Sequence, residues 1–498
     1  MDFEFSIFKH LKIFIMLFNE KNLSLRKLLC SIGVVAVAQF MSCETDDGEE
    51  TRNDSSSPQQ EQKEEPSLNY KALFSSNHTM GMDEARELAL DAASLFAGEC
   101  NGLKSGKVRQ VEEVRVLRPD ETTLRSGSGE VVAIPDTLAY VCNFADSAGF
   151  AIICADDRVG CPILACVDNG TLGEDTDNPG LAIFLDNAQV FMQNSIAKFE
   201  MEKDSLLEVA KYRITVEDSL RGNVLKRKYS GTYNVLHATE EVKPLLPTVW
   251  GQSSSPYNDM TPSCKSNESG HAPTGCWATA IAQIMAYYRS PRAFRHSSTG
   301  SDNVVLDWNK MLSVRDARDL NDGSARRMIS QLLIYIGRNV DMDYDCDGST
   351  AQKDRAMMFL KRLYFLGCET KSYDFQSVKN QLDKSRPVMM SGDRRRIVIS
   401  FRGHAWVVDG YSATPVESYW YEIDMDRKTM VQRCLKSTYD NPLLHINWGW
   451  MGTDNGYFAA GCFDTSKAKE YDYGKECMRR QKSNIIRKTY LLLYMHIM

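Results

Sequence analysis

A cysteine placed ahead of a helix-forming run is the residue of this chain best suited to nucleophilic chemistry. Cys276 follows Gly275, and apolar residues then recur at helical spacing as far as Tyr288, before Ser290-Pro291 ends the pattern. Unpaired N–H groups at a helix start favour an anion, so we expect the thiol pKa to be lowered. Gly275 leaves room for a substrate main chain and is predicted to bind substrate. A structural cysteine beneath a buried helix is the alternative.

A thiolate nucleophile needs an imidazole partner, and His404 and His445 are the two candidates. His404 begins an apolar run that reaches Tyr411 and predicts a strand. A histidine at the mouth of a buried strand is held rigidly and suits a general base. His445 begins a second expected strand that runs to Trp450. We predict that His445 is a structural histidine and that His404 is the base.

Two amide side chains complete the expected site. Asn447 would accept a hydrogen bond from the second ring nitrogen of His404 and so select its tautomer. The neighbouring Trp448 would shield that bond from water and is also predicted to contact substrate. Upstream, Gln252 supplies an amide donor that, together with the backbone N–H of Cys276, would hold the oxyanion of an acyl-transfer intermediate.

Taken in chain order, these motifs resemble the streptopain family of secreted bacterial cysteine peptidases, which have a papain-like fold. The motifs that carry the resemblance are Trp250-Gly-Gln252, Pro256-Tyr-Asn258, Gly275-Cys-x-Ala-Thr-Ala280-x-Ala-Gln283, Arg386-Pro387, Gly403-His-Ala-x-Val-x-Asp-Gly-Tyr411 and Asn447-Trp-Gly-Trp450. The resemblance spans about residues 242–458. Residues 69–200 are similar to the family's propeptide, through Tyr140-Val-x-Asn143 and the run 149–158.

Two positions depart from the family pattern. Met451 stands where the family usually has a glycine after Asn-Trp-Gly-Trp. The segment from Tyr344 to Ala351 resembles the family's glycine-rich substrate loop but contains Cys346 and Thr350. The first departure concerns the shape of a loop and leaves the expected catalytic set intact.

The resemblance implies an α+β protein, with a papain-like cysteine peptidase domain preceded by a small α+β propeptide domain. It implies an endopeptidase made as a zymogen, acting on protein or peptide substrates and needing no metal or organic cofactor. Its own propeptide would be an intramolecular inhibitor. One alternative is a catalytically silent surface lipoprotein that binds peptide or host protein. Another is a transglutaminase-like acyl-transfer enzyme, against which the Asn and the upstream Gln both argue.

The first 43 residues predict export. A basic segment, Lys21–Lys27, precedes thirteen almost wholly apolar residues, Leu28–Phe40, which suits a signal peptide and is short for a membrane span. The run ends at a lipobox-like Cys43, the expected lipidation site, which fits a Bacteroides-type lipoprotein branch of the family. Cleavage by an ordinary signal peptidase is the alternative. Met16 is a second candidate start.

Composition along the chain predicts the remaining boundaries. Residues 44–68 are acidic and polar and are expected to form a disordered tether. Residues 69–220 are the expected propeptide, with helices over 82–98, 181–199 and 204–220 and strands over 138–144, 150–154 and 163–167. Residues 221–241 are the expected linker, containing Lys226-Arg-Lys228 and the processing site. The peptidase domain would cover 242–498.

Overall composition excludes several classes of protein. With 498 residues the chain is long enough for two domains, and 43% hydrophobic with 25% charged residues, near the globular norm, argue against global disorder. Lys and Arg number 59 against 66 Asp and Glu, without a basic block, so no nucleic-acid partner is expected. The 14 cysteines form no Cys-x-x-Cys pair, which argues against a zinc cluster. Membrane contact is expected only through a lipid anchor, at the outer membrane or cell surface, or not at all if the protein is secreted.

Overall fold

The structure is a computed structural model that describes residue 72 and residues 75–96, 109–119, 123–125, 131–218, 228–295, 303–363, 368–393, 403–424 and 429–464, without side-chain detail at 123–125, 205–235 and 418–437. All of them belong to one unit, Pro66–Met498. The expected signal peptide with Cys43 and the expected tether at 44–68 lie outside the described residues. So does the chain after residue 464.

The N-terminal region is a small α+β unit. Its elements are α4 (Met82–Phe96), β1 (Val111–Leu117), β2 (Thr123–Arg125), β3 (Val131–Ala133), β4 (Ala139–Phe144), η1 (Ala145–Ser147), β5 (Phe150–Cys154), η2 (Asp157–Val159), β6 (Ile163–Val167) and α5 (Pro179–Asp218). A buried stripe of Ala85, Ala89, Ala92 and Phe96 fixes α4 against the strands.

The expected helix from Met82 and all three expected strands of this region are confirmed. The helical stretches expected from Leu181 and from Asp204 are parts of one helix, α5, which begins at Pro179 and is capped by Asn178. Nothing between residues 199 and 204 breaks a helix, because the segment contains neither Gly nor Pro.

The C-terminal region divides into helices and strands. The helices are α6 (Cys276–Tyr288), α7 (Trp308–Met311), η4 (Ala317–Asp319), α8 (Gly323–Asn339), α9 (Lys353–Arg362), α10 (Phe375–Leu382) and η5 (Ala460–Phe463). The strands are β7 (Lys228–Leu236), β8 (Glu240–Val242), β9 (Ala293–Arg295), β10 (Asn303–Val305), β11 (Val388–Gly392), β12 (His404–Asp424), β13 (Thr429–Asn447) and β14 (Gly456–Ala459).

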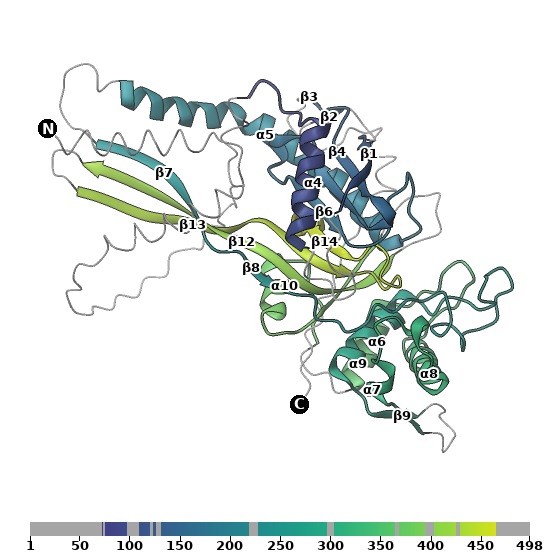
Figure 1. The fold of residues 1–498 in the computed structure, drawn as a ribbon. Coiled ribbons are helices and arrows are strands. Elements are labelled where there is room, and N and C mark those ends of the chain that lie inside the picture. The colour runs from purple at the N-terminus through teal and green to yellow at the C-terminus, as the bar shows by residue number, and fades with distance from the viewer. Residues whose placement is uncertain are drawn as a thin grey trace, which may run out of the picture. The chain divides into compact units, whose positions relative to one another are not determined.

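One ten-stranded sheet runs through both regions. The order β1-β4-β5-β6-β14-β13-β12-β11 passes from the N-terminal strands to the C-terminal strands at the antiparallel pair β6·β14 (Figure 1). At this junction Gly456, Tyr457 and Phe458 face Val167, Cys166 and Ala165. The N-terminal region is therefore hydrogen-bonded to the sheet that carries the strands of the expected catalytic site.

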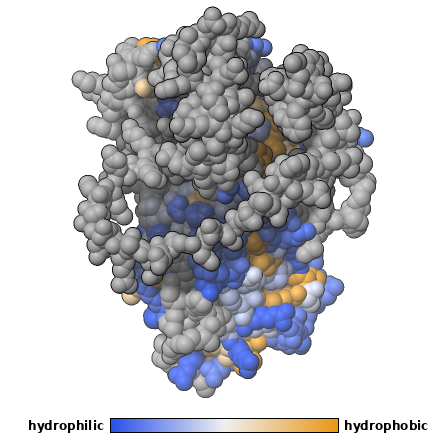
Figure 2. Space-filling model, turned by 90° about the vertical axis from the view of Figure 1, so that its left-hand side faces the viewer, coloured by the Kyte–Doolittle hydropathy of each residue, from blue (hydrophilic) through white to orange (hydrophobic). Residues whose placement is uncertain are grey.

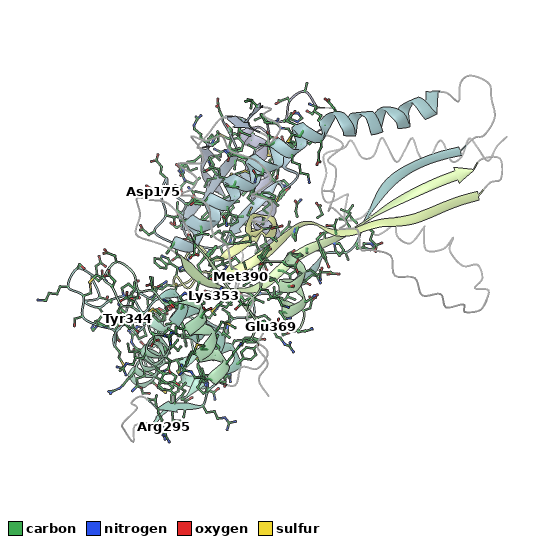
Figure 3. The ribbon with its side chains drawn as sticks, turned by 180° about the vertical axis from the view of Figure 1, so that it is seen from behind. Asp175, Arg295, Tyr344, Lys353, Glu369 and Met390 are labelled. Carbon is green, nitrogen blue, oxygen red and sulfur yellow. A yellow bond between two sulfur atoms is a disulfide. The ribbon has the colours of Figure 1, made fainter. Side chains whose placement is uncertain are left out.

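Two apolar cores lie on opposite faces of β11 and β12. Trp406 and Val408 join the core that contains α4, the start of α5 and the N-terminal strands. Ala405 and Val407 join the other core, which contains α6, α8 and α9. Successive strand residues point to opposite faces, so His404, Trp406 and Val408 share the side of the first core. Met390 of β11, also in the first core, is labelled in Figure 3.

Part of the segment expected to be a linker forms strands. β7 pairs with β12 from Leu236 opposite Val416 to Lys228 opposite Asp424, and β8 pairs with β12 at Tyr411 to Ala413. Beyond the central sheet, β7, β12 and β13 continue as a three-stranded ribbon (Figure 1). Polar composition suggested a loop here, whereas pairing with a distant strand satisfies the backbone.

The described surface is mainly hydrophilic on the face drawn in Figure 2, with smaller hydrophobic areas between the polar ones. No helix within the described ranges combines the length and the apolar character that a membrane span requires. The same ranges contain no group of three or more His, Cys, Asp or Glu side chains arranged to hold a metal ion.

Candidate active site

Cys276 is the first residue of α6, as the sequence predicts. Gly275 is its N-cap, with φ of 91°, a conformation that side chains rarely adopt. A Cβ on Gly275 would lie 2.6 Å from Met342 Sδ and 3.2 Å from the carbonyl oxygen of Ser349. Close packing therefore requires a glycine immediately before the thiol.

The expected lowering of the thiol pKa is wrong for this structure. Cys276 is buried, and burial raises the pKa of its thiol to about 11. The backbone N–H groups of Ala405, Trp277 and Cys276 itself act in the opposite direction and do not compensate. The helix start provides donors to the sulfur, as expected, but loss of solvent outweighs them. In this state Cys276 is a neutral thiol.

His404 is the first residue of β12 and is 3% exposed. Its Nε2 lies 2.8 Å from the carbonyl oxygen of Trp448. Because a carbonyl only accepts, Nε2 carries the hydrogen and Nδ1 of the neutral ring is left as the acceptor. Burial lowers the pKa of His404 to about 4, although the Trp448 carbonyl favours the charged form. Within the described residues no hydrogen bond joins His404 to Cys276.

Asn447 faces α6 and not His404. It stands opposite Val407, whose side chain belongs to the core around α6. Its Nδ2 donates to the Thr248 carbonyl at 3.0 Å, and its Oδ1 accepts from Gln283 Nε2 and from Gly449 N, both at 3.1 Å. The sequence predicted that the Asn447 side chain accepts the hydrogen bond from His404. In this structure the main-chain oxygen of Trp448 accepts that bond instead.

Gln252 is buried beside the start of α6. Its carbonyl accepts from Thr274 N at 2.8 Å, and its Nε2 donor is buried without a hydrogen-bond partner. A buried amide donor without an acceptor carries a desolvation cost. The donor is therefore available to an oxygen that arrives with a ligand, as the oxyanion assignment requires.

Met451 connects the loop after Trp448 to the segment that carries Gln252. It has a φ of 57°, and Ser254 Oγ donates to its sulfur at 3.2 Å. A Cβ on Gly251 would lie 2.3 Å from Met451 Cγ. The strand expected to reach Trp450 ends at Asn447, because Gly449, with φ of 71°, turns the chain.

His445 has a buried partner of its own. Its Nδ1 lies 2.6 Å from Asp409 Oδ1, and the other oxygen of Asp409 accepts from Leu246 N at 3.0 Å. Burial lowers the pKa of His445, but the Asp409 carboxylate outweighs it and the pKa is raised overall. These contacts hold His445 inside the fold, which agrees with the structural role expected for it.

The start of α5 is packed against His404 and Trp448. A Cβ on Gly180 would lie 2.8 Å from His404 Cδ2 and 2.3 Å from Trp448 Cε3. Asn178 caps α5 through its Oδ1, and its Nδ2 donates to Asp454 Oδ2 at 3.1 Å. The N-terminal region therefore covers the imidazole and is hydrogen-bonded to the loop that follows Trp448.

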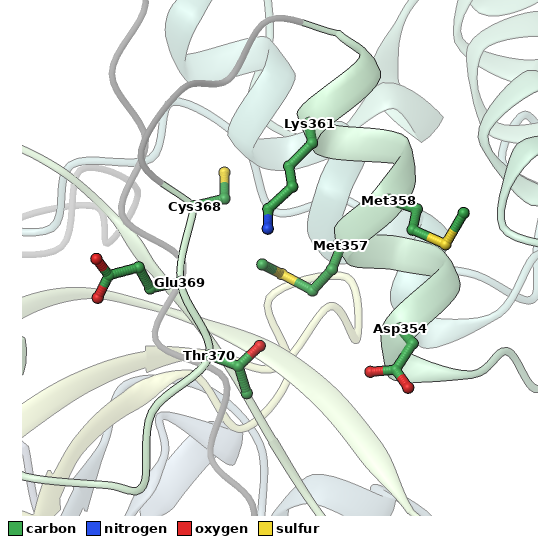
Figure 4. A pocket seen from close by; sticks show the side chains of 7 residues that line it. All are labelled: Asp354, Met357, Met358, Lys361, Cys368, Glu369 and Thr370. Carbon is green, nitrogen blue, oxygen red and sulfur yellow. The ribbon is translucent and has the colours of Figure 1, made fainter.

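A surface depression on α9 lies away from these residues. It has a volume of about 480 Å³ and is lined by Asp354, Met357, Met358, Lys361, Cys368, Glu369 and Thr370 (Figure 4). None of the candidate catalytic side chains lines it. We therefore do not assign the catalytic site to this depression.

Sequence reasoning gave no role to three residues that hold the site together. Gln283 accepts from Trp250 N and pairs with Asn447, while Asn178 and Gly180 meet the site from α5. Gln283 was visible as part of the motif around Cys276, seven residues further along the helix. Asn178-Pro179-Gly180 was visible only as a helix start, since nothing local indicates which surface a helix start will contact.

Cys276 begins a helix of one core, and His404 begins a strand that the N-terminal region covers. This arrangement is the one expected of a cysteine peptidase with its propeptide. Residues 250–458 match the model of the Peptidase C10 family, and residues 87–192 match that of the Spi protease inhibitor. Through these matches the chain is similar to the streptopain family of papain-like cysteine peptidases. The expected fold, an inhibitor-like α+β domain ahead of the peptidase domain, is confirmed.

Individual relatives are distant in sequence. Streptopain of Streptococcus pyogenes serotype M28 (strain MGAS6180) is 24% identical over 414 residues, which cover 76% of this chain and 85% of streptopain. The thiol protease/hemagglutinin PrtT of Porphyromonas gingivalis is 23% identical over 242 residues, 43% of this chain and 23% of PrtT. A solved structure of Prevotella intermedia prointerpain A is 21% identical, covering 73% of this chain and 99% of that one, with a TM-score of 0.42.

Proposed function

We propose that this cysteine peptidase is an exported endopeptidase, made as a zymogen, that hydrolyses peptide bonds through a thioester on Cys276. The close approach of Gly180 to His404 and Trp448 supports the proposal, since it would keep the expected base covered until the propeptide is removed. Both catalytic groups are neutral where they lie, with pKa values of about 11 for the thiol and about 4 for the imidazole.

In the first half of the reaction, Cys276 attacks the peptide carbonyl carbon while His404 Nδ1 takes the thiol proton. The carbonyl oxygen gains negative charge and is stabilised by the backbone N–H of Cys276 and by Gln252 Nε2. When the C–N bond breaks, His404 returns the proton to the leaving amine. A thioester remains on Cys276, and water activated by the same imidazole hydrolyses it.

The remaining site residues position these groups. The Nε2–H of His404 donates to the Trp448 carbonyl, which leaves Nδ1 as the base. Asn447 acts through its amide pair with Gln283 and its bond to Gly449 N, which hold the chain on either side of Trp448. Gly275 admits the substrate main chain, and Trp448, once α5 has left, borders the bound peptide.

Activation requires that α5 leave Trp448 and His404. Solvent then reaches Cys276, the desolvation that raises its pKa is relieved, and the N–H groups at the start of α6 favour the thiolate. The imidazole becomes able to hold a proton near neutral pH for the same reason. Release of the propeptide would thus switch both groups together.

Export is supported by the Cys264–Cys346 disulfide in the peptidase domain, since disulfides persist in oxidising compartments. We propose that residues 1–43 are the signal peptide, that Cys43 is lipidated and that residues 44–68 form the tether. Such a protein would stand at the outer membrane or cell surface.

Active-site labelling tests the proposal. We expect a thiol-directed epoxide peptidase inhibitor to label Cys276 in the processed protein and to abolish casein cleavage in proportion to labelling. A Cys276→Ala chain is the matched control and should neither label nor cleave. Casein cleavage by the Cys276→Ala protein would show that the assignment of the nucleophile is wrong.

A further inference from the structure

One disulfide joins two loops that border the start of α6. Cys264 and Cys346 are 82 positions apart in sequence, and their Cα atoms are 5.7 Å apart. Cys264 lies in the loop 262–272, which precedes Cys276, and Cys346 lies in the turn 343–350, which precedes α9. Tyr344, in the same turn, is labelled in Figure 3. Neither cysteine takes part in the proposed catalytic steps.

Each loop is closed on itself by main-chain hydrogen bonds. Asp343 and Thr350 exchange two N–H···O bonds of 2.8 and 2.9 Å, and Cys264 N donates to the Gly270 carbonyl at 2.8 Å. Asn267 Nδ2 donates to the Cys346 carbonyl at 3.0 Å. The disulfide and this single bond therefore connect two otherwise self-contained loops.

The turn 343–350 reaches the main chain directly before the nucleophile. Ser349 Oγ donates to the Pro273 carbonyl, and the carbonyl of Ser349 would lie 3.2 Å from a Cβ on Gly275. The sulfur of Met342, the residue just before the turn, would lie 2.6 Å from the same Cβ. Met342 and Ser349 therefore form a wall beside Gly275. Because Gly275 has no side chain, the peptide approaches the Cys276 sulfur at this residue. A peptide whose carbonyl oxygen is held at the Cys276 N–H must then pass the wall.

We propose that the Cys264–Cys346 disulfide is a redox-sensitive clamp that sets the affinity of the site for peptide substrates. This inference rests on the proposed peptidase function and adds a control that the catalytic residues do not contain. Closed, the clamp holds the turn 343–350 against residues 273–275, so the wall is formed before the peptide arrives. Opened, the turn must be ordered by each binding event, and affinity falls.

The opening step is a thiol–disulfide exchange with a thiol reductant. Two reductant thiols supply two electrons and two protons; the Cys264–Cys346 S–S bond breaks to two thiols, and the reductant becomes a disulfide. Cys346 is partly exposed and Cys264 is buried, so attack is expected at Cys346. Cys276 is a thiol before and after. The reductant that keeps Cys276 reduced thus also opens the clamp.

The test uses the full chain after self-processing, with active sites counted by the epoxide inhibitor. In the Cys264→Ser/Cys346→Ser double variant we expect KM for a peptide with several residues before the cleaved bond to rise about tenfold. We expect kcat to stay within twofold. Alkylation of Cys276 by iodoacetamide should keep its rate, because this small reagent does not bind along the turn 343–350. Cys368→Ser, which removes another cysteine of the same region, is the control and should keep the wild-type KM.

Reductant gives a second measurement on the unmodified protein. Raising dithiothreitol should increase KM in the wild type and in Cys368→Ser, and should leave the double variant unchanged. If the double variant does not fold, Ser349→Ala removes the bond to Pro273 without touching a cysteine and should raise KM severalfold. If the wild type is active but its KM changes neither with reductant nor on Ser349→Ala substitution, the clamp alone is refuted. A folded double variant with the wild-type KM refutes it too. A wild type that neither cleaves peptide nor labels at Cys276 refutes the proposed function and, with it, the clamp.

Discussion

The hydrogen bond from His404 to a main-chain carbonyl decides which ring nitrogen can act as a base. Nε2 donates to the Trp448 oxygen, so a neutral His404 has its lone pair on Nδ1. The sequence predicted the residues involved but not the acceptor. Asn447 is next to Trp448 in the chain, yet it points to the opposite side of the sheet, a consequence of strand pairing that residue spacing alone does not give.

Substitution of the three candidate residues should separate chemistry from structure. We expect Cys276→Ala and His404→Ala each to abolish peptide hydrolysis, self-processing included, because nucleophile and base act as a unit. His445→Ala should mainly lower stability, by about 3 kcal/mol, because it leaves Asp409 as a buried charge without its partner. Urea unfolding and turnover measured on the same preparations check this. Folded His445→Ala protein as inactive as His404→Ala would mean that the wrong histidine was assigned.

The buried His404 should make the latent fold sensitive to acid. Its pKa is lowered to about 4, whereas an exposed histidine titrates near 6.5. Between about pH 6.5 and 4 the unfolded chain binds a proton that the folded chain does not, so stability falls by up to about 1.4 kcal/mol per pH unit. We expect urea unfolding of the full-length Cys276→Ala chain to show this loss, and a Cys276→Ala/His404→Gln chain to show less.

The comparison isolates His404 because the other buried histidine is present in both chains. His445 has a raised pKa, so its contribution is present below about pH 6.5 and is lost as pH rises through its folded pKa. That contribution cancels in the difference between the two chains. Glutamine retains an amide donor for the Trp448 carbonyl but does not titrate. Equal slopes for the two chains would show that His404 is not held neutral.

At the scale of elements, short-range patterns predicted the parts and long-range contacts arranged them. Apolar periodicity was enough for α4, β4, β5, β6 and α6, whose bounds agree with the expectation to within two residues. The strand β7 was not predicted, because its sequence is polar and its partner β12 lies far along the chain. The same limit hid the Cys264–Cys346 pair, since 14 cysteines without close spacing leave the connectivity undetermined.

α5 can pack against His404 and Trp448 because Gly180 has no side chain. In Gly180→Ala, the added Cβ would meet Trp448 at 2.3 Å and His404 at 2.8 Å. We expect this overpacking to weaken the contact by about 1–3 kcal/mol and to speed self-processing of the full-length chain. Gly81→Ala is the control, since a Cβ there meets no atom within 4 Å. Gel analysis of processing over time should show a faster Gly180→Ala chain; equal rates would mean that α5 does not govern latency.

At the scale of the whole molecule, the propeptide and the peptidase share a sheet as well as a surface. The β6·β14 pair and the Asn178–Asp454 bond tie the N-terminal domain to the loop that carries Trp448. The sequence indicated an inhibitory domain through its resemblance to a propeptide. It did not indicate this sheet continuity, because both β6 and β14 are strands whose apolar residues fit either an edge or an interior position.

Processing should therefore leave β7 uncut. β7 is hydrogen-bonded to β12 along its whole length, and a strand in a sheet is a poor protease substrate. Within the proposed linker, 221–241, we expect the cut ahead of β7, at Lys226 or Arg227, so that the mature N-terminus keeps both β7 and Trp250-Gly-Gln252. A full-length Cys276→Ala chain should stay intact, while the active chain shortens and activity rises as the shorter species accumulates.

Mass spectrometry of the processed chain locates the cut, and a linker variant tests its necessity. In Lys226→Ala/Arg227→Ala/Lys228→Ala we expect slower shortening and a matching delay in activity, since α5 remains on His404 until the chain is cut. A permanent binding module at 69–220 would instead leave the uncut chain fully active. An uncleaved linker variant as active as the processed enzyme would rule out latency, and a cut after Leu236 would show that β7 does not protect its own segment.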